Sequence, residues 1–264
     1  MESKRSTYRK IIRLRGGERV ETEDQVVIEA PVTIYLNGSE LVTLLCTPEK
    51  IDRLALGFLL SEGLLSSIDD LASIRTREEE GLVEIDLKDE TVSLEKFYGK
   101  RTITSGCGKG TIFFNVIDSL RSKPLTGRLQ IDSFRLQAMM HELQQQAALF
   151  KSTGGVHSAA LTDKERIIFF CEDIGRHNAV DKIIGESLIE GTSMDGKLFI
   201  LSGRISSEIL LKAAKLQIEL IASRAAPTSL SIELAEKLNI TLVGFVRGER
   251  MNIYTHQWRI ITPL

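Results

Sequence analysis

One cysteine in a glycine-rich segment is the residue of this sequence best suited to covalent chemistry. Cys107 stands between Gly106 and Gly108 in the segment 104–111 (TSGCGKGT), so neighbouring side chains cannot enclose its thiol. Lys109 follows two residues later, and a nearby cation lowers the pKa of a thiol toward the thiolate at neutral pH. A thiolate can accept or deliver sulfane sulfur. The segment therefore predicts a nucleophile that handles sulfur.

The other two cysteines have apolar neighbours. Cys46 ends the run Leu44-Leu45-Cys46 and Cys171 ends Phe169-Phe170-Cys171, which favours inert packing in the core. Three widely spaced cysteines with no Cys-x-x-Cys pair predict neither a zinc site nor a disulfide framework, and they fit a reducing cytosol.

Four segments combine glycine, serine and arginine. They are 172–178 (EDIGRHN), 202–208 (SGRISSE), 223–229 (SRAAPTS) and 245–250 (FVRGER). Glycine lets a backbone approach a ligand, helix N-termini offer N–H groups and arginine binds phosphate through two hydrogen bonds. Together they predict a site for a large polyphosphate or nucleotide, whereas each alone could be a capping turn.

The histidines divide into two pairs. His177 and His157 stand beside glycine-containing turns, where a ligand contact and a structural cap are both open. His141 and His256 are expected at the surface or in structural roles. No zinc-deaminase signature of the His-x-Glu and Pro-Cys-x-x-Cys type occurs.

The elements that would position these residues change character along the chain. Strand-like runs cover 26–36, 40–46 and 83–87, and Asn37-Gly38 between the first two predicts a hairpin. Thr47-Pro48 predicts a capped start for a helix that carries Leu54, Phe58 and Leu65.

The second half alternates strands and helices. A helix from Ser133 is followed by strands at 156–161 and 166–171, a helix at 176–190, a strand at 197–201, helices at 206–223 and 229–237, and a strand at 240–246. This order predicts an α/β fold with a mostly parallel sheet covered on both faces. Ligands of such sheets bind beyond the carboxyl ends of the strands, where the four segments fall.

Composition excludes several classes of protein. The chain is 42% hydrophobic and 27% charged with a formal net charge of −2, so no nucleic-acid partner is expected. No apolar run approaches the roughly 18 residues of a membrane span, and the charged N-terminus is unlike a secretory signal. We therefore expect a cytoplasmic protein.

Seven segments, taken in order, resemble the formate dehydrogenase accessory sulfurtransferase family (FdhD/NarQ) over nearly the whole chain. They are 29–32 (EAPV), 47–63 (from Thr47-Pro48 to GFLLSEG), 106–108 (GCG), 153–157 (TGGVH), 172–182 (EDIGRHNAVDK), 202–204 (SGR) and 245–250 (FVRGER). The resemblance implies a fold similar to cytidine deaminases without their zinc. We expect a three-layer α/β/α C-terminal domain (126–264) and a smaller strand-rich N-terminal domain (1–125) that carries Cys107.

The resemblance also implies a sulfur relay. Sulfane sulfur would pass from a cysteine desulfurase to a Cys107 persulfide. It would then pass to the bis-molybdopterin guanine dinucleotide cofactor, holding molybdenum or tungsten, of a formate dehydrogenase catalytic subunit. A homodimer and no structural metal are expected. The cofactor-binding residues expected from the resemblance and from the strand-end loops are Phe245, Val246, Arg247, Gly248, Glu249, Arg250, Arg176, His177, Gly203 and Arg204.

One position departs from the family pattern. Many members carry Cys-Gly-x-Cys in the cysteine segment, but here the second cysteine is replaced by Gly110, so one thiol must both receive and release sulfur. Two alternatives stay open at this point. The chain could be a non-catalytic molybdenum-cofactor chaperone, or a nucleotide-acting hydrolase, although no metal ligands or glutamate base are evident for the hydrolase.

Overall fold

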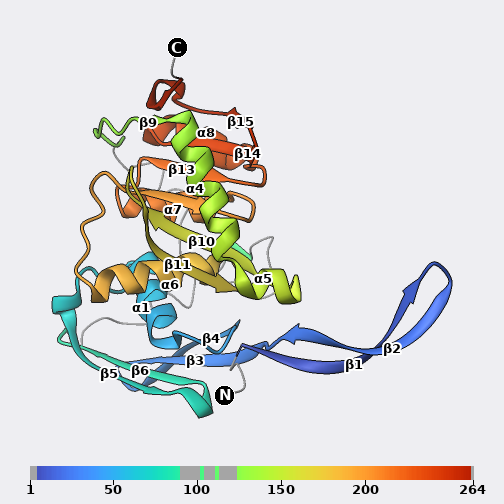
Figure 1. Ribbon diagram of the computed structural model, residues 1–264. Helices are drawn as coiled ribbons and strands as arrows, with labels where there is room; N and C mark the ends of the chain where they lie inside the picture. The colour runs from blue at the N-terminus through green and yellow to red at the C-terminus, as the bar shows by residue number, and fades with distance from the viewer. Residues whose placement is uncertain (1–4, 90–101, 104–110, 113–123, 263–264) are drawn as a thin grey trace.

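A computed structural model of the chain describes residues 5–89, 102–103, 111–112 and 124–262 (Figure 1). Within this part of the chain, no helix is long and apolar enough to cross a membrane. The elements form an N-terminal hairpin, a four-stranded sheet with one helix, and a six-stranded sheet with helices on both faces.

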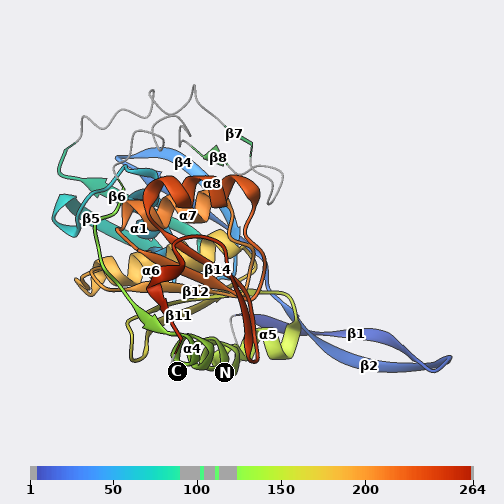
Figure 2. The ribbon, with the colours of Figure 1, turned by 90° about the horizontal axis from the view of Figure 1, so that it is seen from above.

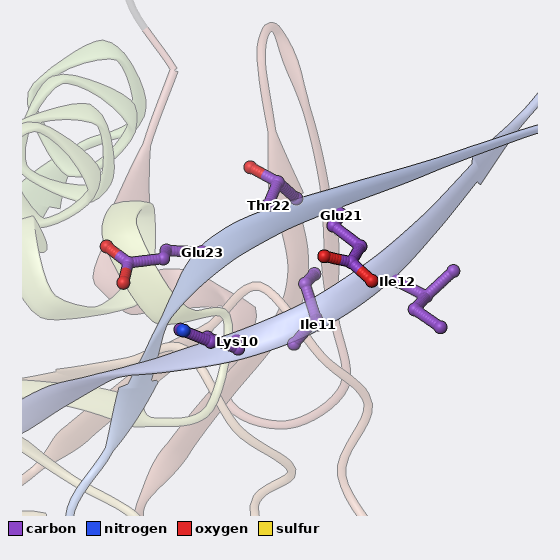
Figure 3. Close-up of a pocket in the computed structure, with 6 residues that line it drawn as sticks. All are labelled: Lys10, Ile11, Ile12, Glu21, Thr22 and Glu23. Carbon is purple, nitrogen blue, oxygen red and sulfur yellow. The ribbon is translucent and has the colours of Figure 1, made fainter.

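The N-terminal hairpin projects away from the body of the molecule (Figures 1 and 2). Strand β1 (Ser6–Arg15) pairs antiparallel with β2 (Glu18–Val27), and Gly16 and Gly17 turn the chain with φ values of 59° and 90°. At the base of this arm, Val27 lies against Gly155. The pocket in Figure 3 is lined by residues of these two strands, such as Ile11 and Thr22, and so belongs to the arm.

The four-stranded sheet has the order β4-β3-β6-β5 and packs against helix α1. Its elements are β3 (Ala30–Leu36), β4 (Ser39–Cys46), α1 (Ile51–Glu62), β5 (Leu71–Arg77) and β6 (Leu82–Leu87). The hairpin expected at Asn37-Gly38 is confirmed, with φ values of 48° and 75°. The run 26–36 is two strands and not one, because the chain leaves β2 at Val27 and enters β3 at Ala30.

Helix α1 begins later than its sequence predicts. Its N-cap is Lys50, with φ 52° and no side-chain cap, so the prediction of a Thr47 cap is wrong. The hydroxyl of Thr47 instead donates to the Asp173 carboxylate at 2.8 Å and accepts from Lys182 at 2.8 Å. The Thr47 hydroxyl, which local sequence rules assigned to the helix N-terminus, therefore bonds with a buried ion pair.

The six-stranded sheet has the order β11-β10-β12-β13-β14-β15. Its strands are β10 (His157–Thr162), β11 (Ile167–Asp173), β12 (Leu198–Leu201), β13 (Leu220–Ser223), β14 (Thr241–Arg247) and β15 (Arg250–Ile253). Only the β12–β13 and β13–β14 pairs are parallel, so the expected mostly parallel sheet is in fact mixed. The short turn after β10 and the tight β14–β15 connection each impose antiparallel pairing.

Strand β13 was predicted as the end of a helix over 206–223. Helix α7 ends at Lys215, and Gln217 turns the chain with φ 60° into the buried strand Leu220–Ser223. Short apolar runs do not distinguish a buried strand from a helix by periodicity, which explains the error.

Helices cover both faces of this sheet, as expected for three layers. Helix α4 (Ser133–Gln146) packs on one face against side chains such as Ala160, Ile200 and Val243. Helices α6 (Arg176–Ile189), α7 (Ser207–Lys215) and α8 (Ser229–Leu238) lie on the other, against alternate residues such as Ala159, Phe199 and Leu242. The α/β architecture is confirmed, and the specific likeness to cytidine deaminases stays a prediction.

Short elements complete the chain. Helix α5 (Ala148–Thr153) follows α4, the two-residue strands β7 (Thr102–Ile103) and β8 (Thr111–Ile112) pair with each other, and β9 (Ile131–Asp132) pairs with β16 (Ile260–Ile261). The Asp132 carboxylate caps α4 by accepting from the N–H groups of Phe134 and Arg135.

The two parts of the molecule meet where α1 crosses α6. A Cβ atom on Gly57 of α1 would lie 1.8 Å from the carbonyl oxygen of Asp181, and one on Gly185 of α6 would lie 1.9 Å from that of Arg53. Both positions therefore need glycine, because each helix backbone occupies the space of the other's missing side chain. This crossing joins the four-stranded sheet to the six-stranded one.

Candidate functional site at the strand ends

Four strands of the large sheet point the same way and bring their following loops to one edge. Strands β11, β12, β13 and β14 share a direction, and the opposed β10 begins at the same edge, where His157 pairs with Asp173. We call this the strand-end edge; it comprises residues 154–157, 174–178, 202–206, 224–228 and 245–250. The four segments singled out in the sequence thus lie together.

Gly203 is where the loop after β12 comes close to His157 and Arg176. A Cβ atom on it would lie 3.1 Å from Nδ1 of His157 and 3.3 Å from Cβ of Arg176. The hydroxyl of Ser223 donates to the Gly203 carbonyl at 2.6 Å, which ties this loop to the end of β13. The structure therefore brings Gly203 and Arg176 together, as predicted, and adds His157.

His177 is held by its neighbours in α7. Its Nε2 lies 2.8 Å from Oε2 of Glu208 and 3.2 Å from the hydroxyl of Ser206. Burial lowers the pKa of His177 even though the Glu208 carboxylate opposes this change. Burial alone would raise the pKa of Glu208, but the hydrogen bond to His177 and the positive charges of His177, Arg176 and Lys212 together lower that pKa. This side chain is thus engaged inside the protein.

His157 differs from His177 in its surroundings. It is half-buried at the start of β10. Burial lowers its pKa first, and the positive charges of Arg176 and Arg204 lower it further. The neutral form of the imidazole is therefore favoured beside these two guanidinium groups.

The residues of the predicted cofactor-binding segment 245–250 differ in how they are buried and what they contact. Phe245 has φ 53° at a bulge in β14, and the guanidinium of Arg247 lies 5.6 Å from the centre of its ring. Val246 is buried in the core against α4, so its side chain does not face the edge. Arg247, Gly248, Glu249 and Arg250 are exposed, and Arg250 already belongs to β15.

Arg224 is a further cation at the edge that the site prediction omitted. Its carbonyl oxygen accepts from Nε of Arg247 at 3.0 Å, and its backbone N–H donates to Leu201 at 3.1 Å. Its own Nε is buried and has no hydrogen-bond partner within the part of the chain that the structure describes. The available signal was its place in the segment 223–229, one of the four segments that combine serine or glycine with arginine.

The motif 172–182 mainly connects α6 and the end of β11 to α1 and to the end of β4. Asp173 pairs with Lys182 at 2.6 Å, and both side chains are almost completely buried with Thr47. Asp181 pairs with Lys212 at 2.5 Å and accepts from Ser61 of α1 at 2.8 Å. Conspicuous charges in this motif therefore hold α1 and β4 against α6.

Two neighbours of these charges are also structural. Asn178 donates from Nδ2 to the Leu45 carbonyl at 2.8 Å, which adds a link to β4. Both carboxylate oxygens of Glu172 accept, at 2.9 Å each, from the first N–H groups of α5 at Leu149 and Phe150. Of the motif, only Ile174 to Asn178 belongs to the strand-end edge.

Two of the three cysteines lie in the core, as expected from their apolar neighbours in the sequence. Cys46 and Cys171 are buried, and burial raises the pKa of Cys46 to about 12 and that of Cys171 to about 11. Both thiols are thus held protonated. Cys107, the predicted nucleophile, and Lys109 lie outside the described residues, in the segment between β7 and β8. Among the described residues, no group of three or more His, Cys, Asp or Glu side chains is placed to hold a metal ion.

Comparison with known proteins places the chain in a family. Residues 27–261 match the family model described as the FdhD/NarQ family. The chain is 45% identical over 98% of its length to the sulfur carrier protein FdhD of Bacillus subtilis, covering 99% of that protein, and 45% identical over 96% to that of Listeria monocytogenes serotype 4b, covering 98%.

A solved structure agrees with this assignment. The crystal structure of a protein described as a formate dehydrogenase accessory protein from Desulfotalea psychrophila superposes with a TM-score of 0.78 and 26% identity. The match covers 97% of this chain and all of the other. The chain therefore belongs to the FdhD/NarQ family.

Proposed function

We propose that this chain is a sulfur carrier that serves a formate dehydrogenase, with Cys107 as the residue that carries the sulfur. The observation that supports it most is the family match over residues 27–261, together with full-length relatives named as sulfur carrier proteins. The three cysteines of the chain add support, because burial suppresses the thiolates of Cys46 and Cys171 and leaves Cys107 as the candidate.

The proposed loading step is a thiol–persulfide exchange. The Cys107 thiolate attacks the outer sulfur of a cysteine desulfurase persulfide, the old S–S bond breaks, and a new one forms on Cys107. The desulfurase leaves as a thiolate, so the step consumes no oxidant or reductant. Since Gly110 stands where many relatives carry a second cysteine, Cys107 acts without an internal disulfide partner.

The strand-end edge is proposed to hold the recipient of the sulfur. A bis-molybdopterin guanine dinucleotide cofactor carries several phosphates, and the edge gathers Arg176, Arg204, Arg224 and Arg247 around loops whose backbones can approach a ligand. We propose that a homodimer in the cytoplasm performs this transfer to the formate dehydrogenase catalytic subunit.

The decisive experiment follows sulfur on the protein. The wild type and Cys107→Ala are incubated with a cysteine desulfurase and cysteine, analysed by intact-mass and peptide mass spectrometry, and tested for formate dehydrogenase activation in cells that lack the native gene. We expect one added sulfur on Cys107, none in the variant, unchanged GDP binding by the variant, and no activation by it.

Each contrary result points to a different conclusion. Full activation by Cys107→Ala would overturn the sulfur-carrier role of that residue. Loss of activation without any sulfur ever appearing on wild-type Cys107 would favour the non-catalytic cofactor chaperone. Cys107→Ala is compared with Cys171→Ala, because Cys171 is buried and its loss removes a thiol without removing the proposed carrier.

A further inference from the structure

The strand-end edge carries several arginines, and two of the acids near His157 are paired within the protein. Arg176 and Arg204 both lie near enough to His157 to lower its pKa. The Asp173 carboxylate, the acid nearest to His157 in the paired strands, is bonded to Lys182 at 2.6 Å. The Glu208 carboxylate lies 2.8 Å from His177. The positive charges of Arg176 and Arg204 beside the imidazole therefore favour an anionic ligand.

The position of His157 within this cluster is set by the backbone. Strand β10 is fixed there because the N–H of Ser158 donates to the hydroxyl of Ser202 at 2.8 Å. Nδ1 of His157 would lie 3.1 Å from a Cβ on Gly203, which is a tight contact, so glycine lets the loop after β12 come this close without displacing the imidazole. The ring thus lies between the start of α6 and the loop after β12, beside both arginines.

The two histidines of the edge differ in what they can offer a ligand. Nε2 of His177 is already within hydrogen-bond distance of Glu208 and Ser206. A ligand that used this nitrogen would have to break a buried charge-assisted pair. Among the described hydrogen bonds, none engages a ring nitrogen of His157, whereas His177 is held on the α7 side.

We propose that His157 contacts a phosphate group of the ligand bound at this edge and takes up a proton when that ligand binds. This inference deepens the proposed function and rests on its nucleotide-binding part. It assigns a ligand contact to a residue outside the predicted set and makes His177 a positioning residue. The ligand class is a nucleoside diphosphate or a larger molecule that contains one.

The direction of the coupling follows from the charges that face His157. Burial, Arg176, Arg204 and His177 oppose its protonation in the free protein, and Asp173 favours it. A bound diphosphate brings negative charge that compensates the arginines and accepts a hydrogen bond from the imidazolium, so its pKa rises. Between the pKa of the free protein and that of the complex, binding takes up a proton and affinity falls as pH rises.

Isothermal titration calorimetry with GDP tests this coupling. Titrations at pH 7 in several buffers of different ionisation enthalpy give the number of protons taken up per GDP bound. For the wild type we expect a net uptake of protons, and an affinity that weakens by up to about tenfold per pH unit within the coupling window. His157→Asn should bind GDP more weakly and with no uptake.

The control and the contrary outcomes are distinct. His141→Gln removes a histidine from the exposed side of α4 and should match the wild type. GDP binding by the wild type without proton uptake, or uptake that persists in His157→Asn, would refute this inference and leave the proposed function standing. Absence of any GDP binding would refute the nucleotide site itself. Absence of uptake in the wild type refutes the inference without any variant, and His157→Gln, which also cannot be protonated, replaces His157→Asn if that variant folds poorly.

Discussion

Replacing Gly57 by alanine should destabilise the protein at the α1–α6 crossing. The new methyl group would lie 1.8 Å from the Asp181 carbonyl oxygen and 2.9 Å from the Gly185 nitrogen, and both are backbone atoms within a helix. An ordinary carbon–oxygen contact is about 3.3 Å or more. The helices must therefore separate by roughly 1.5 Å, because no flexible side chain can move aside.

This separation would stretch the hydrogen bonds that cross the interface. Ser61 donates to Asp181 at 2.8 Å and Lys182 donates to Thr47 at 2.8 Å, and both bonds involve buried charged groups. Losing one such bond costs about 1.5–3 kcal/mol, and overpacking costs a further 1–3 kcal/mol or so. Alanine recovers about 1 kcal/mol of helix propensity. The net loss should therefore be about 3 kcal/mol, the middle of the range these terms span.

Urea and thermal unfolding followed by circular dichroism measure this loss. At about 2–4 °C for each kcal/mol, the melting temperature should fall by roughly 6–12 °C. Gly185→Ala should behave alike, since its Cβ would lie 1.9 Å from the Arg53 carbonyl oxygen. Gly154→Ala is the control, because it has open space around it and only its left-handed backbone, φ 66°, costs about 1 kcal/mol. Unchanged or raised stability in Gly57→Ala would refute the close crossing.

Three further outcomes are expected. Lys182→Met should lower the free energy of unfolding by about 3–5 kcal/mol in the same denaturation assay, because it leaves the buried Asp173 carboxylate unpaired. The control Arg13→Ala removes the exposed Arg13–Asp24 pair and should cost under about 1 kcal/mol. Equal effects of the two substitutions would contradict this account. Iodoacetamide at pH 8 should label Cys46 and Cys171 only after denaturation, as read by peptide mass spectrometry, and rapid labelling of either in the native protein would show that it is not buried. The pKa values of His157 and His177 are lowered on folding, so the unfolded chain binds more protons below pH 6.5 and the free energy of unfolding should decline as pH falls through that value. Urea unfolding at several pH values measures this decline, and His157→Asn should make it less steep. An unaltered slope in the variant would contradict this prediction.

Local sequence patterns predicted much of the architecture. The Asn37-Gly38 hairpin and the helix from Ser133 follow from short-range rules on positive φ and helical periodicity, and both are confirmed. The convergence of four loops at one edge follows from strand direction. Strand β13 was missed, because a four-residue apolar run has no period of its own and is defined by its neighbours in the sheet.

The roles of individual polar residues depended on long-range partners. Thr47 reads locally as a helix cap, but it bonds a carboxylate and an ammonium that lie more than a hundred positions away in the chain. His177 reads as a ligand contact, yet Glu208 of the next helix holds it. These partners cannot be predicted from sequence spacing, because they become neighbours only when α1, α6 and α7 pack together.

By itself, the sequence determined the family, the candidate thiol and the chemical character of the strand-end loops, because each depends on residue types within short segments. Only the tertiary structure decided which charged residues pair within the protein and which side chains reach the strand-end edge. Asp173, Asp181 and Lys182 form buried ion pairs beside the α1–α6 crossing, whereas Arg224 and His157 reach the strand-end edge. Burial is the physical reason, since a charge withdrawn from water must find its partner within the fold.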